Sequence, residues 1–114
     1  MKINRFEDII AWQKAKELTI EVYKNFQSNR DFGFRDQIQR ASVSIMNNIA
    51  EGFERKGNKE FRNFLFISKG SSAEIRSMLY VAHDLRYLSQ ASFNNLLART
   101  EEISRLLSGF IKTL

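Results

Sequence analysis

The sequence contains no cysteine and no proline, and only five glycines among its 114 residues. Without cysteine there is no disulfide framework, no cysteine-ligated zinc and no cysteine nucleophile. Without proline, and with few glycines, few turns are obligatory, so we expect a small number of long elements. His83 is the sole histidine, which excludes a metal site built from several histidines.

Long apolar runs are also missing. The longest extend over a few residues, far short of the roughly 20 that span a bilayer. The first residues contain no uninterrupted apolar region and carry Glu7 and Asp8, so they do not resemble a signal peptide. We therefore expect a cytoplasmic protein without membrane association. Hydrophobic residues make up 43% and charged residues 27%, which is ordinary globular composition and predicts one domain over residues 1–114.

Apolar residues recur every three or four positions in four segments, which is the spacing of amphipathic helices. The predicted helices run from about residue 8 to 27, 31 to 53, 58 to 88 and 89 to 113. Four such helices with short connections predict an all-α, antiparallel up-down-up-down four-helix bundle. The core stripes of the first, second and fourth helices are Ala11, Ala15, Leu18, Val22 and Phe26; Phe34, Ile38, Ala41, Ile45 and Ile49; and Phe93, Leu96, Thr100, Ile103, Leu107, Phe110 and Leu114.

The third predicted helix carries two parallel stripes, which together are wider than one seam of a bundle requires. One is Phe61, Leu65, Ser68, Ser72, Ile75, Leu79 and Ala82; the other is Phe64, Ile67, Ser71, Glu74, Met78, Val81, Leu85 and Leu88. The small residues at 70–72 predict a close helix crossing rather than a break, because the heptad phase continues across them.

Helix ends are predicted from polar residues and glycine. Asp31 and Ser89 are candidate N-caps, and Gly57 can supply the left-handed conformation that follows a helix end. At the first helix, Asn4 with Glu7 forms a possible capping box, and Asp8 is a rival start.

Enzyme chemistry has little support in the residues. His83 is a lone candidate general base, and the carboxylate pairs at 51/54 and 101/102 lack the Glu-x-x-His motif of di-iron bundles. Nucleotide-binding and nucleophile-elbow motifs are missing as well. We therefore expect a protein that is not an enzyme, with no catalytic residue, cofactor or metal site.

Positive charge is the more informative feature. The net charge is +5, which favours anionic partners and nucleic acid first. Four basic residues, opposed only by Glu60, gather where the second and third helices meet: Arg55, Lys56, Lys59 and Arg62. This cluster suits phosphate binding. Alternatively, it is a solvated helix end in which Arg55 and Lys56 complement the helix dipole.

Surplus apolar side chains are the second functional clue. The chain has ten phenylalanines, and five apolar residues do not obviously fit a single four-helix seam: Phe53, Phe64, Phe66, Ile67 and Met78. Such a surplus indicates subunit contact. A wide, phenylalanine-packed core is the alternative.

Three motifs resemble those of the bacterial 23S rRNA intervening-sequence protein family, also known as four-helix-bundle proteins. They are DIIAWQKA at 8–15, QIQRASVSI with NIAEG between 37 and 52, and FLFISKGSSAE at 64–74. The sequence departs from the family pattern at Met46, where members often have proline, and at Gln39, where arginine is frequent.

This resemblance implies a four-helix bundle without catalytic activity. It also implies kinship with the accessory protein of diversity-generating retroelements, a ring-shaped homopentamer that binds nucleic acid and a reverse transcriptase. The implied partners are therefore further copies of this chain in a pentamer, RNA or DNA, and a reverse transcriptase.

Four polar residues in or beside these motifs form a further candidate set: Arg40, Asn48, Glu51 and Glu74. Polar groups beside apolar stripes require partners when buried. We expect them to form a structural network that fixes helix register, with Arg40 pairing with one of the acids. A ligand site made of the same residues is the alternative. The preferred function is an oligomeric nucleic-acid-binding accessory protein; the alternative is a structural or protein-interaction bundle without nucleic-acid binding.

Overall fold

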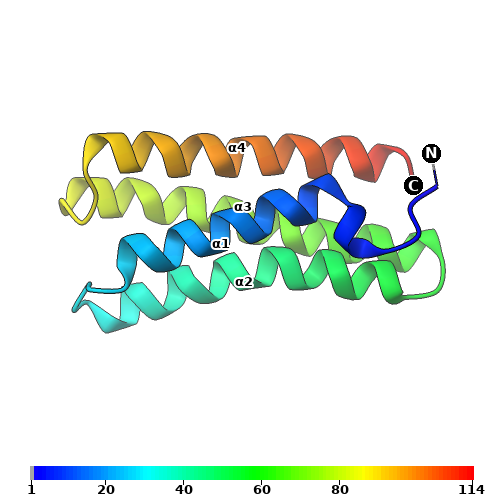
Figure 1. The fold of residues 1–114 in the computed structure, drawn as a ribbon, viewed down its shortest axis with the longest axis horizontal. Helices are drawn as coiled ribbons and strands as arrows, with labels where there is room; N and C mark the ends of the chain where they lie inside the picture. The colour runs from blue at the N-terminus through cyan, green and yellow to red at the C-terminus, as the bar shows by residue number, and fades with distance from the viewer. Residues whose placement is uncertain (1) are drawn as a thin grey trace.

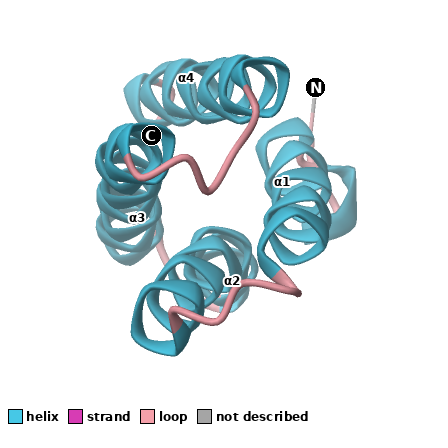
Figure 2. Cartoon of the chain, turned by 90° about the vertical axis from the view of Figure 1, so that its left-hand side faces the viewer, coloured by secondary structure: helices cyan, strands magenta, loops and turns pink. Residues whose placement is uncertain are grey.

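The computed structural model describes residues 2–114, which form a short 3-10 helix and four α-helices. The elements are η1 (Phe6–Asp8), α1 (Ile10–Phe26), α2 (Phe32–Glu54), α3 (Asn58–Asp84) and α4 (Gln90–Lys112). Consecutive helices run in opposite directions, so the α2–α3 turn lies at the opposite end of the bundle from the other two turns (Figure 1). Viewed end-on, the helices form a ring in which each packs against two neighbours (Figure 2). The predicted all-α four-helix bundle is confirmed.

The core follows the predicted stripes closely. On α1 the five residues of the predicted stripe are the buried residues of the helix. On α3 the first stripe, from Phe61 to Ala82, is buried, whereas the members of the second stripe that lie on this helix are not. Ile67, Val81 and Leu85 of that second stripe are about half exposed, at 51%, 47% and 52%. A single helix can turn only one stripe fully inward, so α3 keeps a second apolar edge at its surface.

Small polar residues mark the close crossings of α3. Ser68 donates a hydrogen bond to the Ile45 carbonyl of α2 at 2.8 Å, and Ser72 donates one to the Thr100 carbonyl of α4 at 3.1 Å. Both serines are fully buried. The helix is continuous through this region, as predicted, although the contacts are made by the serines while Gly70 faces open space.

The prediction that the third helix reaches residue 88 is wrong, because α3 ends at Asp84. Arg86 adopts a positive φ of 61°. The N–H groups of Tyr87 and Arg86 return to the carbonyls of Ala82 and His83 at 2.8 and 3.0 Å. This is a Schellman ending with arginine at the position that glycine usually occupies. Because that position has no glycine, the end of α3 could not be predicted from the sequence.

The helix starts were predicted with mixed success. The side chains of Asp31 and Ser89 cap α2 and α4, as expected. Neither Asn4 nor Asp8 caps α1; that helix begins after Ile9, whose side chain is buried. Burial of Ile9, together with the edge-to-face contact between Phe6 and Trp12 at 5.2 Å, decides where the chain enters the bundle. Across residues 2–114, no helix is both long enough and apolar enough to cross a membrane.

Candidate nucleic-acid interface

The α2–α3 turn brings the predicted basic cluster to one end of the bundle. After α2 ends at Glu54, the Arg55 N–H bonds back to the Gly52 carbonyl at 3.2 Å. Gly57 then adopts a φ of 90° immediately before α3. This conformation favours glycine, and it allows three residues to reverse the chain.

The four residues of this cluster differ in how firmly they are held. Arg55 forms an ion pair with Glu51 at 3.2 Å, and its guanidinium lies over the Phe64 ring, 5.2 Å from the centroid. Arg62 is half-buried and donates a hydrogen bond to the carbonyl of Leu114. Lys56 and Lys59 are exposed, and no ion pair involves them among the described residues.

An aromatic layer supports this end of the bundle. Phe61 packs edge-on against Phe53 and Phe110, with centroid separations of 5.9 and 5.3 Å. Beside it lies a cavity of about 360 Å³ that Arg55 and Asn58 line together with these rings. The N-terminal end of α3, which carries Lys59 and Arg62, is therefore packed against aromatic rings.

The four residues predicted as a polar network do not join one another. Glu51 binds Arg55 of the same helix, and Asn48 donates hydrogen bonds to the Ser44 carbonyl and hydroxyl at 2.8 and 3.0 Å. Ser44 in turn contacts Ser71 of α3 at 2.9 Å. Asn48 thus connects α2 to α3 through a serine pair that the prediction did not include.

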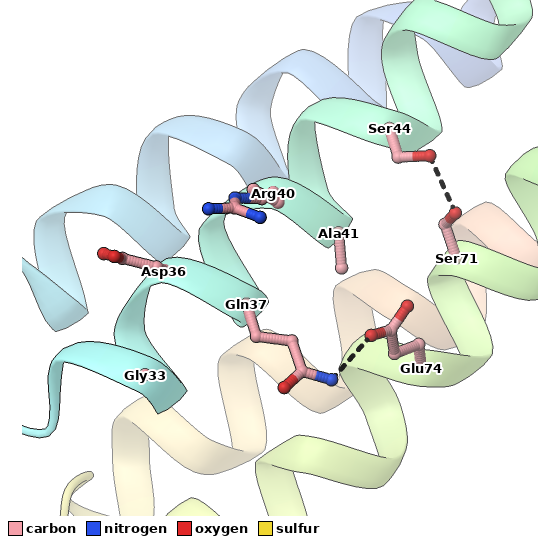
Figure 3. Close-up of a pocket in the computed structure, with 8 residues that line it drawn as sticks. All are labelled: Gly33, Asp36, Gln37, Arg40, Ala41, Ser44, Ser71 and Glu74. Carbon is pink, nitrogen blue, oxygen red and sulfur yellow. Dashed lines mark hydrogen bonds between the residues drawn. The ribbon is translucent and has the colours of Figure 1, made fainter.

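Glu74 and Arg40 line a groove of about 520 Å³ between α2 and α3 (Figure 3). Glu74 accepts a hydrogen bond from Gln37 of α2 at 3.1 Å. Arg40 points away from Glu74 (Figure 3), and within residues 2–114 it has neither an ion pair nor a hydrogen bond. Arg40, Glu51 and Glu74 are all exposed, so the burial that would demand a paired network is missing.

The five surplus apolar residues fall into two groups. Phe53, Phe64 and Met78 are half-buried, and Phe53 and Met78 pack against the core. Phe66 and Ile67 are each 51% exposed. The wide core therefore accounts for part of the surplus, and α3 presents the rest at the surface.

His83, the candidate general base, makes local contacts at the α3–α4 end of the bundle. The His83 Nε2 atom lies 2.9 Å from the Gln90 Oε1 atom, and its ring packs on Phe93 at 4.4 Å between centroids. Among residues 2–114, no three histidine or carboxylate side chains converge as metal ligands would.

A second basic surface escaped the sequence analysis because its members are spread along the chain. Between α3 and α4 lies a groove of about 430 Å³ with Arg76 on one wall and Arg105 and Lys112 on the other. Lys69 precedes Arg76 by one heptad, as Arg105 precedes Lys112. This seven-residue spacing was the available signal, and a search for basic residues close together in sequence does not detect it.

Comparison with known proteins gives one family and one fold. The family model described as 23S rRNA-intervening sequence protein matches residues 7–109. No curated protein matches the chain. A crystal structure of a protein of unknown function from the S23 ribosomal protein family of Bacteroides thetaiotaomicron is similar, with a TM-score of 0.85 and 24% identity. The likeness covers 90% of this chain and 99% of that one, and it shows that the fold is shared.

Proposed function

Because the chain belongs to the 23S rRNA-intervening sequence protein family, we propose that it is a non-enzymatic, oligomeric protein that binds nucleic acid through the α2–α3 turn. The observation that carries this proposal is the pair of exposed lysines, Lys56 and Lys59, beside Arg55 and Arg62 at one end of the bundle. The net charge of +5 draws a polyanion toward the molecule.

Binding at this turn is electrostatic and tolerant of sequence. Lysine and arginine hold phosphates without reading bases. Lys56 and Lys59 make such contacts directly. Arg55 exchanges its pairing with Glu51, which is solvent-exposed and therefore weak, for a phosphate. Phe61 is buried at 8% exposure and offers no base a stacking surface.

Self-association through the second stripe of α3 is the other part of the proposal. Three members of that stripe, Phe64, Ser71 and Glu74, contact α2, so the stripe runs along the α2 side of α3. Its half-exposed residues Ile67 and Val81 are the apolar material available for a neighbouring subunit. The resemblance to the accessory proteins of diversity-generating retroelements favours a closed ring of five. In such a ring the basic cluster recurs once per subunit, so weak contacts combine.

The remaining partners follow from the same resemblance. We propose RNA or DNA as the ligand and the cytoplasm as the compartment in which it is met. The kinship with retroelement accessory proteins suggests a reverse transcriptase as the protein partner. Finding a reverse-transcriptase gene beside the gene for this protein would support that partner directly.

The test of nucleic-acid binding is fluorescence anisotropy with labelled RNA and DNA over a range of salt concentrations. We expect R55Q/K56Q/K59Q/R62Q to abolish binding of double-stranded DNA while helicity and assembly persist. Fewer substitutions should lower the slope of log affinity against log salt by about one per lost contact. The matched control K14Q/K16Q/K24Q/R30Q removes four charges from α1 and the turn after it. If cluster variant and parent bind equally at matched salt, the bundle serves a purely structural or protein-interaction role at this surface.

A further inference from the structure

The edge of α3 that faces α4 carries two basic side chains with an aromatic side chain on either side of them. Phe66, Lys69, Arg76 and Tyr80 are spaced by three, seven and four residues, which places them on one stripe of the helix. Arg76 lines the α3–α4 groove, and the Tyr80 ring contacts Phe93 of α4 edge-on at 5.5 Å. This edge is distinct from the apolar edge along α2.

The two rings are available to a ligand. Phe66 and Tyr80 are each 51% exposed, although both are large and apolar enough to favour burial. They lie 14 residues apart, which corresponds to about 21 Å along a helix and to about six stacked nucleotides.

The groove between α3 and α4 is basic on both walls and polar in its lining. Arg76 projects from α3, and Arg105 and Lys112 from α4; Ser104 and Ser108 add hydroxyls. One carboxylate, that of Glu101, also lines it. Within residues 2–114, none of these three cations is engaged in an ion pair, whereas Arg5, Arg35, Arg55 and Arg99 each are.

We propose that the α3–α4 groove binds single-stranded nucleic acid. The phosphates lie between Arg76 of α3 and Arg105 and Lys112 of α4. Lys69, one heptad before Arg76 on the same stripe of α3, adds a fourth cation beside the groove, and bases stack on Phe66 and Tyr80. A basic track combined with aromatic platforms is the physical basis of single-strand recognition, because every base offers a π-face. Neighbouring helix axes in such a bundle are only about 8–10 Å apart, so the groove admits one strand and excludes the interior of a paired duplex.

This inference rests on the proposed function, since nucleic acid is the partner in both, but it assigns a different surface and a preference for unpaired strands. The α2–α3 turn supplies charge alone and treats single and double strands alike. The groove adds stacking, which paired bases cannot provide.

The test compares a thymidine 15-mer, a uridine 15-mer and a blunt 15-base-pair DNA duplex by fluorescence anisotropy. We expect the parent protein to bind the single strands more tightly than the duplex. The variant F66L/Y80L keeps apolar bulk and all charges but removes both stacking surfaces; it should bind the single strands about tenfold or more weakly. Its affinity for the duplex should change less than twofold. The control Y23L/F32L removes two rings that are exposed to a similar degree on α1 and α2 and should bind like the parent.

The charge part is tested separately with K69Q/R76Q/R105Q. This variant should lose affinity for the single strands and keep the mass of the parent in light scattering. If F66L/Y80L binds the single strands like the parent, or if it dissociates because the rings are subunit contacts, the inference is overturned. If the turn variant R55Q/K56Q/K59Q/R62Q abolishes binding while both groove variants bind normally, the proposed function stands and this inference fails. A parent protein that binds none of the three probes overturns both.

Discussion

Gly52 of α2 lies directly against Phe64 of α3. A Cβ atom at position 52 would stand 2.5 Å from the Cβ atom of Phe64 and 3.0 Å from the Cδ1 atom of Phe61. Such separations are shorter than van der Waals contact, so only glycine lets the helices approach this closely. This contact sets how closely the N-terminal end of α3, which carries Lys59 and Arg62, approaches α2.

Replacing Gly52 by alanine should therefore destabilise the protein by about 1–3 kcal/mol, because the added methyl group forces α2 and α3 apart. Gly70 is the matched control: it also lies inside a helix, but a Cβ there meets nothing within 4 Å. Gly70→Ala should leave stability unchanged or raise it by about 0.5–1 kcal/mol. Urea unfolding followed by circular dichroism measures both, and equal midpoints for the two variants would contradict the close approach.

Arg86→Gly should raise stability by up to about 1 kcal/mol. Arg86 has a φ of 61° at the end of α3, a conformation that costs an ordinary L-residue about 1–2 kcal/mol and glycine almost nothing. The greater freedom of glycine in the unfolded chain offsets part of the gain. Arg86→Ala is the control and should give no gain. Thermal unfolding of the three proteins distinguishes these outcomes, and a lower melting temperature for Arg86→Gly would count against the Schellman ending.

Self-association should give a particle whose mass is a multiple of 13.4 kDa, with five copies expected. Introducing charge into the apolar edge with I67E/V81E should dissociate it and keep its helicity, since both side chains are about half exposed within one subunit. Ile20→Glu is the control on α1, where the side chain is 45% exposed. Multi-angle light scattering is the measurement. A parent protein of 13.4 kDa at micromolar concentration would exclude the oligomer.

Tyr87 makes stability sensitive to alkaline pH. Its hydroxyl donates a hydrogen bond of 2.7 Å to Asp31, and this bond, helped by partial desolvation and by the charge of Asp31, raises the pKa of Tyr87 above its ordinary value of 10.0. A raised folded-state pKa means that the stabilisation is complete below about pH 10 and is lost as the pH rises through the folded-state pKa. Tyr87→Phe should lack this pH-dependent stabilisation. Urea midpoints from pH 8 upward test it, and parallel pH curves for the two proteins would contradict it.

The fold was largely predictable because the apolar residues that recur with helix periodicity are the residues that the core buries. The five apolar residues chosen on α1 are the ones that the structure buries, and Asp31 and Ser89 cap the helices that they were expected to cap. The end of α3 was mispredicted by four residues, because the left-handed position is held by Arg86, which the packing of Leu88 into the core keeps in place. A local pattern cannot show a conformation that tertiary contacts impose.

The basic residues of the candidate interface likewise fall into a group that the sequence predicted and a group that only the fold brings together. Arg55, Lys56, Lys59 and Arg62 were found because they are close in sequence. Arg76, Arg105 and Lys112 were not, because α3 and α4 must pack side by side before these residues line one groove. The same holds for the serine pair of Ser44 and Ser71, whose members lie on different helices and 2.9 Å apart.

By itself, then, the sequence determined the number of helices, the stripe that α1, α2 and α4 each turn inward and the basic turn between α2 and α3, since these depend on residues within a few positions of each other. Tertiary structure alone decided which of the two stripes on α3 is buried, where α3 ends and which cations share a groove. The physical reason is that only one face of a helix can pack against its neighbours, and the shape of those neighbours decides which face it is. Ser68 and Ser72 lie on the buried face because their small side chains permit close packing and donate hydrogen bonds to carbonyls of the neighbouring helices. The larger Ile67 and Val81 lie on the other stripe and remain at the surface.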